Sequence, residues 1–158
     1  MTYRAMDVAK TFFELAQKDG KTLTNMHLQK LVFFAHGFTW ALLDRPLIIE
    51  ETKAWDYGPV ISPLYNKLKK FGSTAVEPNV FEDIEGINTN IDADSYAIVK
   101  KVWDVYGKYN ARELSDISHR IGSPWHQVWN ADDGKFAVIP SEFIRDYYLA
   151  QTKSKPAA

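Results

Sequence analysis

The stretch between Thr24 and Leu43 constrains the fold most, because it is apolar on nearly every side of a helix. Its apolar side chains are Leu28, Leu31, Val32, Phe33, Phe34, Ala35, Phe38, Trp40, Ala41, Leu42 and Leu43. A helix of this kind needs other elements to cover it on all sides. Thr24 or Asn25 is suited to cap its first turn, because a side-chain oxygen there accepts a free backbone N–H. The stretch therefore predicts a central, mostly buried helix around which the other elements pack.

Six other segments have the apolar spacing of helices that bury one face. A serine followed by a proline opens two of them, at residues 62–63 and 123–124, and this pair suits a cap and a first helical position. Asn110 with Glu113 has the spacing of a capping box. The six segments are residues 6–19, 62–71, 94–109, 110–121, 123–129 and a last helix that Ser141 caps.

Extended structure is predicted to be a minor part of the fold. Residues 48–55 are β-capable and are expected to form a short strand or an extended segment. Residues 136–139 are a second candidate for a short strand. The connection 73–91 contains Gly, Pro, Asn and acids with little periodicity, so we expect it to be irregular, with a short strand at Val80 and Phe81 as an option.

The chain has 158 residues, enough for one domain with a sizeable core. The sequence therefore predicts a mainly α fold, a single compact domain of about seven helices with a minor short β element. The domain is expected to span residues 1–150. Residues 151–158 form a polar end that is expected to be a disordered tail.

Composition excludes several classes of function. The chain has no cysteine, which removes disulfides, thiolate chemistry and cysteine-based zinc sites and suits a reducing compartment. A formal net charge of −1 gives no overall field to hold nucleic acid or an anionic membrane. The start of the chain lacks the pattern of a secretory signal, and the apolar run at 31–43 is too short to span a bilayer. We therefore expect a soluble, cytoplasmic protein.

The sequence contains no recognisable catalytic or metal-binding constellation, so we expect neither enzyme activity nor a cofactor. The four histidines do not form the paired helical spacing of a zinc peptidase, and no nucleophile elbow or phosphate-binding glycine loop is present. An enzyme that works through His36 or His119 stays open as an alternative. Gln29 and His36 share one face of the central helix, and they favour an internal hydrogen-bond network over a contact with a ligand.

A second alternative is a DNA-binding regulator. Residues 110–130 are predicted to form a helix, a glycine turn at Gly122 and a second helix, as in a helix-turn-helix. The second helix offers mainly aromatic and neutral polar residues, with only Arg120 as a nearby cation. Because affinity for DNA depends on neutralising phosphates, a helical hairpin inside the core explains the same residues better.

Four segments together resemble the Panacea domain, the SocA-like antitoxin family that is often phage-associated. The segments are "LQKLVFFAHGF" (28–38), "AWDYGPV" (54–60), "LYNKLKKFG" (64–72) and "ELSDISHRIGSPW" (113–125). This resemblance implies an antitoxin of a toxin–antitoxin system, which neutralises a cognate protein toxin, encoded by an adjacent gene, through direct contact. It also implies that a member of this kind can act as an adaptor that delivers the toxin to a cytoplasmic protease. It implies no catalytic residues.

Five aromatic residues are the candidates for binding such a partner, because large aromatics dominate both cores and binding hot spots. Trp55 and Tyr57 flank an acid next to the chain break at 58–59, where they either fill the core or face a partner. Trp125 and Trp129 are four residues apart on one short helix, with the same two alternatives. Tyr147 lies on the last helix, which falls outside the shared segments.

Overall fold

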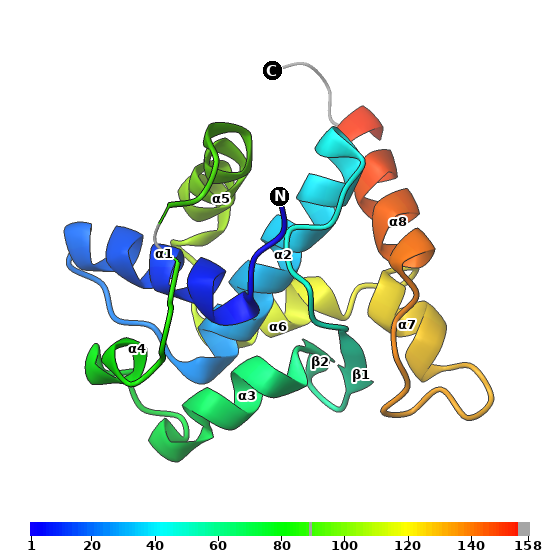
Figure 1. Ribbon diagram of the computed structural model, residues 1–158. Helices are drawn as coiled ribbons and strands as arrows, with labels where there is room; N and C mark the ends of the chain where they lie inside the picture. The colour runs from blue at the N-terminus through cyan, green and yellow to red at the C-terminus, as the bar shows by residue number, and fades with distance from the viewer. Residues whose placement is uncertain (89, 155–158) are drawn as a thin grey trace.

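Helix α2 (Asn25–Leu43) is the centre of the fold in the computed structural model, which describes residues 1–88 and 90–154. Helices α1 (Ala5–Lys18), α3 (Ser62–Leu68), α5 (Ala93–Tyr106), α6 (Ala111–Ser118) and α8 (Ser141–Ser154) all contact it, as does strand β2 (Gly58–Val60), as Figure 1 shows. Leu28, Leu31 and Val32 have no exposed surface, so the helix is covered on several sides. The predicted central, mostly buried helix is thus confirmed.

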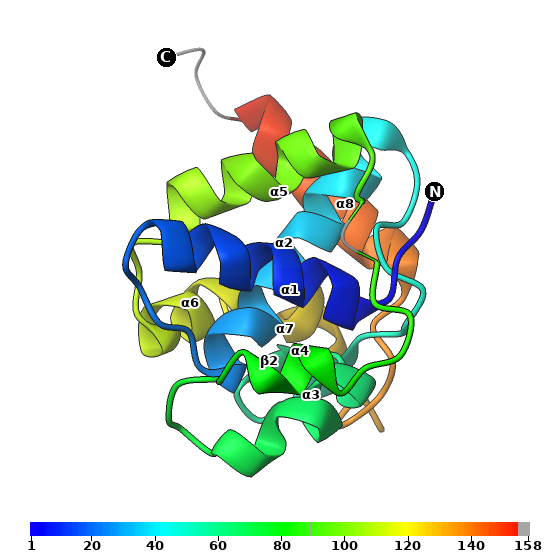
Figure 2. The same cartoon turned by 60° about the vertical axis from the view of Figure 1, so that its left-hand side comes forward.

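Eight α-helices and one short two-stranded sheet form the part of the chain at 1–88 and 90–154, which confirms the mainly helical fold class. Figure 2 shows α1 lying across α2, with α5 along one side of it and α3 and α4 along the other. The helices other than α2 are α1 (Ala5–Lys18), α3 (Ser62–Leu68) with a 3₁₀ turn η1 (Lys69–Phe71), α4 (Asn79–Glu82), α5 (Ala93–Tyr106), α6 (Ala111–Ser118), α7 (Pro124–Trp129) and α8 (Ser141–Ser154).

Helix α4 corrects the prediction for the connection at 73–91, where an optional strand was placed at Val80 and Phe81. Both side chains are buried, and the ring of Phe81 packs 5.1 Å from that of Phe13 on α1. A strand would send neighbouring side chains to opposite faces, whereas one turn of helix can turn both toward the core. The prediction of about seven helices did not include α4, which is the eighth α-helix in the described residues.

The β element is a hairpin of β1 (Lys53–Trp55) and β2 (Gly58–Val60), with Ala54 paired to Pro59. The predicted short strand or extended segment at 48–55 thus contains β1 at its end, and an isolated bridge joins its first residue, Ile48, to Tyr3. Sequence reasoning took Gly58 and Pro59 only as a chain break and missed β2. Pro59 has no N–H, and a proline of this kind is tolerated on an edge strand.

Residues 136–139 lie beside β1 but form no regular strand, which corrects the second strand prediction. The N–H of Ala54 donates to the carbonyl of Ala137 at 2.9 Å. The N–H of Ile139 donates to the carbonyl of Thr52 at 2.8 Å. Only one isolated bridge, between Lys53 and Val138, has ladder geometry. The segment therefore lines the hairpin without extending the sheet.

Three of the predicted helix starts are confirmed in detail. The side chains of Thr24, Asn110 and Ser123 each accept a backbone N–H three residues ahead, and Asn110 forms a capping box with Glu113. The other two predicted caps are displaced by one residue. Ser62 and Ser141 are the first residues of α3 and α8, and the cap position of α3 is Ile61.

The polar residues of α2 form internal hydrogen bonds, as the sequence favoured. His36 Nδ1 lies 3.2 Å from the backbone nitrogen of Leu47 and 3.3 Å from that of Ile48, and it accepts from both. Gln29 accepts the N–H of Ile61 at 2.9 Å and donates to Asn25 at 3.0 Å. These bonds fix the segments after α2 and β2 against the central helix, because buried backbone N–H groups need acceptors.

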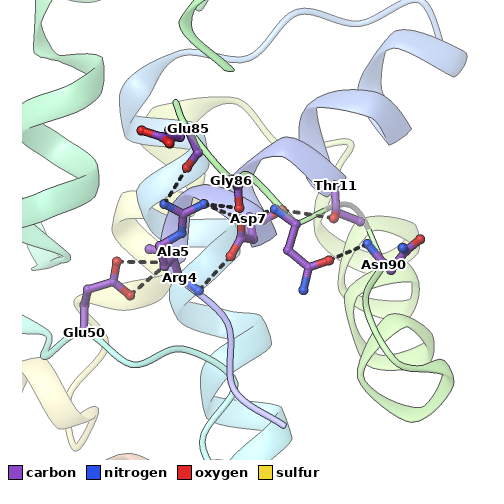
Figure 3. A network of polar contacts seen from close by, with 9 residues as sticks. Arg4, Ala5, Asp7, Thr11, Glu50, Glu85, Gly86 and Asn90 are labelled. Carbon is purple, nitrogen blue, oxygen red and sulfur yellow. Dashed lines mark hydrogen bonds and ion pairs between the residues drawn. The ribbon is translucent and has the colours of Figure 1, made fainter. Parts of the chain in front are cut away.

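A polar network at the start of α1 fixes the long connection before α5 (Figure 3). The buried carboxylate of Asp7 accepts the backbone N–H of Arg4 at 3.0 Å and that of Asn88 at 2.7 Å. The Arg4 guanidinium donates to the carbonyl of Gly86 at 2.8 Å. Glu50 accepts the N–H of Ala5, so two carboxylates face the positive end of the α1 dipole.

Helix α8 continues to Ser154. Residues 151–154 of the expected tail are therefore helical, and residues 155–158 lie outside the described residues. Across the described part of the chain, every helix is too short or too polar to cross a membrane.

Candidate functional site

A groove of about 830 Å³ opens beside the β hairpin. The first turns of α2 and α6, the side of α3 and the loop before Ala137 form its walls. Its aromatic lining residues are Trp55, Tyr57, Tyr65 and Phe136, and its charged or titratable ones are Lys30, Asp56, Lys69, Arg112, Asp116 and His119.

The hairpin at one end of the groove is clamped through its carbonyl groups. The indole N–H of Trp125 donates to the carbonyl of Trp55 at 2.6 Å, and the hydroxyl of Ser115 donates to that of Tyr57 at 2.8 Å. The ammonium of Lys30 donates to the carbonyl of Pro59 at 2.9 Å. Side chains from α7, α6 and α2 thus hold a turn that has only a three-residue strand on each side.

His119 completes this clamp from α6. Its Nε2 lies 3.2 Å from the carbonyl oxygen of Asp56, and its Nδ1 lies 2.6 Å from that of Ser115. Each ring nitrogen therefore lies beside a backbone carbonyl, while the half-buried ring lines the groove. The alternative of an enzyme that works through His119 loses its free base in this arrangement, because a general base must reach the proton that it abstracts. His36, the other candidate, is buried and accepts two backbone N–H groups.

Lys30 is fully buried below the hairpin, and no carboxylate lies within ion-pair distance of it in the described residues. Burial lowers the pKa of its ammonium to about 7. An isolated buried charge is unfavourable, so the lysine exchanges readily between its charged and neutral forms near neutral pH.

Gly58 makes room for this lysine. Its φ of 109° is one that side chains rarely adopt, and a Cβ there would lie 2.5 Å from Ser118 Oγ and 3.0 Å from Lys30 Nζ. Glycine is therefore needed here for two reasons: it adopts the positive φ, and it leaves space for the side chains that approach from α2 and α6. This explains why the chain has glycine at the second strand of the hairpin.

A continuous row of rings runs from the wall of the groove into the body of the protein. Trp55 contacts Tyr65 at 5.0 Å and Phe136 at 6.3 Å between ring centroids. Phe136 contacts Trp129 at 5.7 Å, and Trp129 stacks on Trp125 at 5.4 Å. Such pairs add to the stability of the hairpin beyond the area that they bury.

Phe136 has the positive φ of 65° that favours glycine and leaves 55% of its surface exposed. Its N–H donates to the carbonyl of Ala54 at 2.7 Å, which holds the backbone in place. A bulky residue in this conformation costs on the order of 1 kcal/mol or more, and such strain clusters at functional sites. The conformation keeps an exposed ring on the rim of the groove.

The structure brings four of the five predicted aromatic residues to this site. Tyr57 is 68% exposed at the tip of the hairpin, and Trp55 is half-buried in the wall of the groove. Trp125 is buried and Trp129 is half-buried behind that wall. Tyr147 lies elsewhere, against Tyr148 on α8 and away from the groove.

The packing of α7 argues against the alternative of a DNA-binding helix-turn-helix at 110–130. Trp125 and Val128 of α7 are buried, and the Trp125 indole N–H is already bonded to the hairpin. A recognition helix needs a free face for the major groove of DNA. Here the aromatic face of α7 packs against the protein itself.

Several groove residues escaped the sequence analysis. Lys30 is the clearest case, and its signal was a charged residue within a helix that is otherwise apolar all round. Lys69 is one of three lysines on a solvated face, Arg112 follows a cap, and Tyr65 lies on a short helix. Phe136 was expected only as part of a strand. No local pattern in the sequence places these residues together.

The fold and site define a small helical domain that presents a rigid hairpin and an open, aromatic groove. The chain belongs to the Antitoxin SocA-like, Panacea domain family, whose pattern matches residues 28–126. It is 29% identical over 159 aligned residues to Antitoxin SocA of Caulobacter vibrioides (strain NA1000 / CB15N), a match that covers 95% of this chain and 85% of the relative. No solved structure matches the chain.

The segments that carry the family resemblance meet at the hairpin. The acceptor carbonyls belong to residues 54–60, and the four donors are Lys30 from residues 28–38 and Ser115, His119 and Trp125 from residues 113–125. These residues therefore support one structural unit, from which the side chain of Tyr57 stands out.

Proposed function

We propose that this protein is the antitoxin of a toxin–antitoxin pair and neutralises a cognate protein toxin by direct contact through the hairpin and its groove. The single observation that carries the proposal is the exposed ring of Tyr57 on a turn that three helices hold rigid. A rigid, exposed aromatic loses little conformational entropy when a partner covers it, and such residues are typical hot spots. Family membership gives the class of partner.

The groove next to Tyr57 supports binding in preference to catalysis. Four aromatic side chains line the groove near the hairpin, and its one histidine faces two backbone carbonyls. A stable complex buries about 1,600 Å² in total, so the partner is expected to cover the hairpin, the groove and adjoining parts of α3 and α6 together.

Co-expression with the product of the adjacent gene tests the proposal. The toxin alone is expected to arrest growth, and this protein is expected to restore growth and to co-purify with the toxin. A neighbouring product that is harmless, or a toxic product that neither binds this protein nor is neutralised by it, would reject the proposal.

The fate of the toxin separates two modes of neutralisation. Occlusion leaves the toxin level unchanged, whereas delivery to a cytoplasmic protease shortens the half-life of the toxin only when this protein is present. Pulse-chase measurement of the toxin, in cells with and without each major cytoplasmic protease, distinguishes these modes.

A further inference from the structure

The groove is polarised along its length, because each of three helices has one part near the hairpin and another part farther along the groove. On α3, Tyr65 contacts Trp55, and Lys69 follows one turn later at the start of η1. On α6, His119 reaches the hairpin, and Arg112 lies two turns away at the start of the helix.

Helix α2 follows the same pattern. Lys30 reaches the hairpin, and Asn25 begins the helix at the other end of the groove. The far end therefore combines the exposed side chains of Lys69 and Arg112 with the first turns of two helices. The partial positive charge at the start of α2 adds to that of the two cations, whereas the Glu113 carboxylate offsets it at the start of α6 and the C-terminal end of α3 opposes it beside Lys69.

One acidic residue of the groove lies next to this charge, but it forms no ion pair with either cation. Asp56 is at the hairpin, and Asp116 is one turn along α6 from Arg112, toward His119. Within the described residues, no ion pair joins Lys69, Arg112, Asp56 or Asp116 to any partner. Both cations are thus free to pair with an incoming group.

Resting on the proposed function, we infer that the groove binds an extended segment of the protein partner, with a carboxylate at the Lys69–Arg112 end and an apolar or aromatic side chain against Trp55 and Phe136. Charge complementarity fixes the direction of the segment, because Lys69 and Arg112 are the exposed cations among the described residues that line the groove. An arginine pairs well with a carboxylate through two parallel hydrogen bonds.

Peptide selection tests this inference. Random peptides of about twelve residues, which extend to about 40 Å, are displayed and panned against the wild-type protein and against the K69E/R112E variant. Peptides selected by the wild type are expected to be enriched in Asp or Glu on one side of an aromatic or aliphatic residue. Those selected by the variant are expected to carry Lys or Arg at the acidic position.

Binding of one selected acidic peptide is then measured by fluorescence anisotropy. We expect K69E/R112E to weaken it by tenfold or more, and added salt to weaken wild-type binding, as for an exposed charge contact. The control K67E/K153E makes the same change in net charge at exposed lysines outside the groove and is expected to bind like the wild type. Circular dichroism checks that both variants fold.

Three outcomes would overturn the inference. One is the absence of acidic enrichment in the wild-type selection, and another is binding of the selected peptides that K69E/R112E leaves unchanged. The third is binding of a mixed-sequence oligonucleotide, but not of peptides, that depends on the same two cations. The co-expression assay separates this inference from the proposed function, because a K69E/R112E variant that still neutralises the toxin contradicts only the inference.

Discussion

The indole N–H of Trp125 donates to the carbonyl oxygen of Trp55 at 2.6 Å, so a buried ring of α7 holds the strand that leads to the exposed Tyr57. Seventy positions separate the two residues in the sequence. The bond belongs to a set of four contacts that fix the hairpin from three helices, and it connects the aromatic core to the proposed binding surface.

Replacing Trp125 by phenylalanine is expected to destabilise the protein, because the carbonyl of Trp55 loses its donor. The matched control is W129F, which shrinks a neighbouring ring that forms no hydrogen bond in the described contacts. We expect W125F to reduce the free energy of unfolding by about 1–3 kcal/mol more than W129F does. Urea denaturation measures the difference, and equal losses would show that the hydrogen bond contributes nothing.

Stability is expected to increase with pH above neutrality through Lys30. Burial holds its pKa at about 7 in the folded state, against an ordinary value of 10.5. Between these values the unfolded chain binds more protons than the folded one, so raising the pH favours folding. Urea midpoints measured from pH 7 to about pH 9.5 are therefore expected to rise in the wild type and much less in K30M.

The exposed Lys67 on the neighbouring helix α3 provides the control. K67M is expected to keep the pH dependence of the wild type, because an exposed ammonium has nearly the same surroundings in both states. If K30M retains the full rise, the buried amine is not its source.

Acid is expected to destabilise the protein through His36. Burial lowers the pKa of its imidazole to about 4, and the neutral ring accepts two backbone N–H groups. Since an unfolded histidine titrates near its ordinary value of 6.5, the unfolded state gains protons first as the pH falls from about 6.5 to about 4. The loss over this range is on the order of 3 kcal/mol.

H36Q removes this titration while keeping a side-chain acceptor for the same N–H groups. Its stability is expected to be nearly flat between pH 6.5 and about pH 4, apart from the contribution of other groups. His27, whose pKa burial also lowers, is a useful comparison because it is only half-buried. H27Q is expected to reduce the acid sensitivity less than H36Q, and the reverse order would contradict the assignment.

Tyr57 is expected to matter for toxin binding and not for stability. Its side chain is 68% exposed, so Y57A removes little buried surface. We expect Y57A to weaken toxin binding by about tenfold or more, as for an interface hot spot, with an unchanged melting temperature. Calorimetry with purified toxin measures the affinity. Y96A, at a partly exposed tyrosine on α5, is the control and should bind like the wild type.

Local patterns in the sequence were enough to predict the helices that carry strong caps or clear apolar spacing. The all-round apolar stretch of α2 identified the centre of the fold, and the capping residues at positions 24, 110 and 123 marked three helix starts. These signals are local, because capping and periodicity involve residues within one or two turns. The short turn α4 was missed because four residues give no period to detect.

The candidate site was only partly predictable. Trp55 and Tyr57 were recognised as candidates, but the sequence left open whether they face the core or a partner. The packing decides this separately for each residue, with Trp55 half-buried in the groove wall and Tyr57 exposed. Residues of one β turn can differ in this way because contacts from other elements set their burial.

The sequence by itself determined a helical domain with a buried central helix, its main helix boundaries and its family. Only the tertiary structure decided that Lys30 would lie under Gly58, that Phe136 would close the row of rings, and that Lys69 and Arg112 would line the same groove. The reason is physical: helix formation depends on neighbours in the chain, whereas a groove is made by residues that only long-range packing brings together.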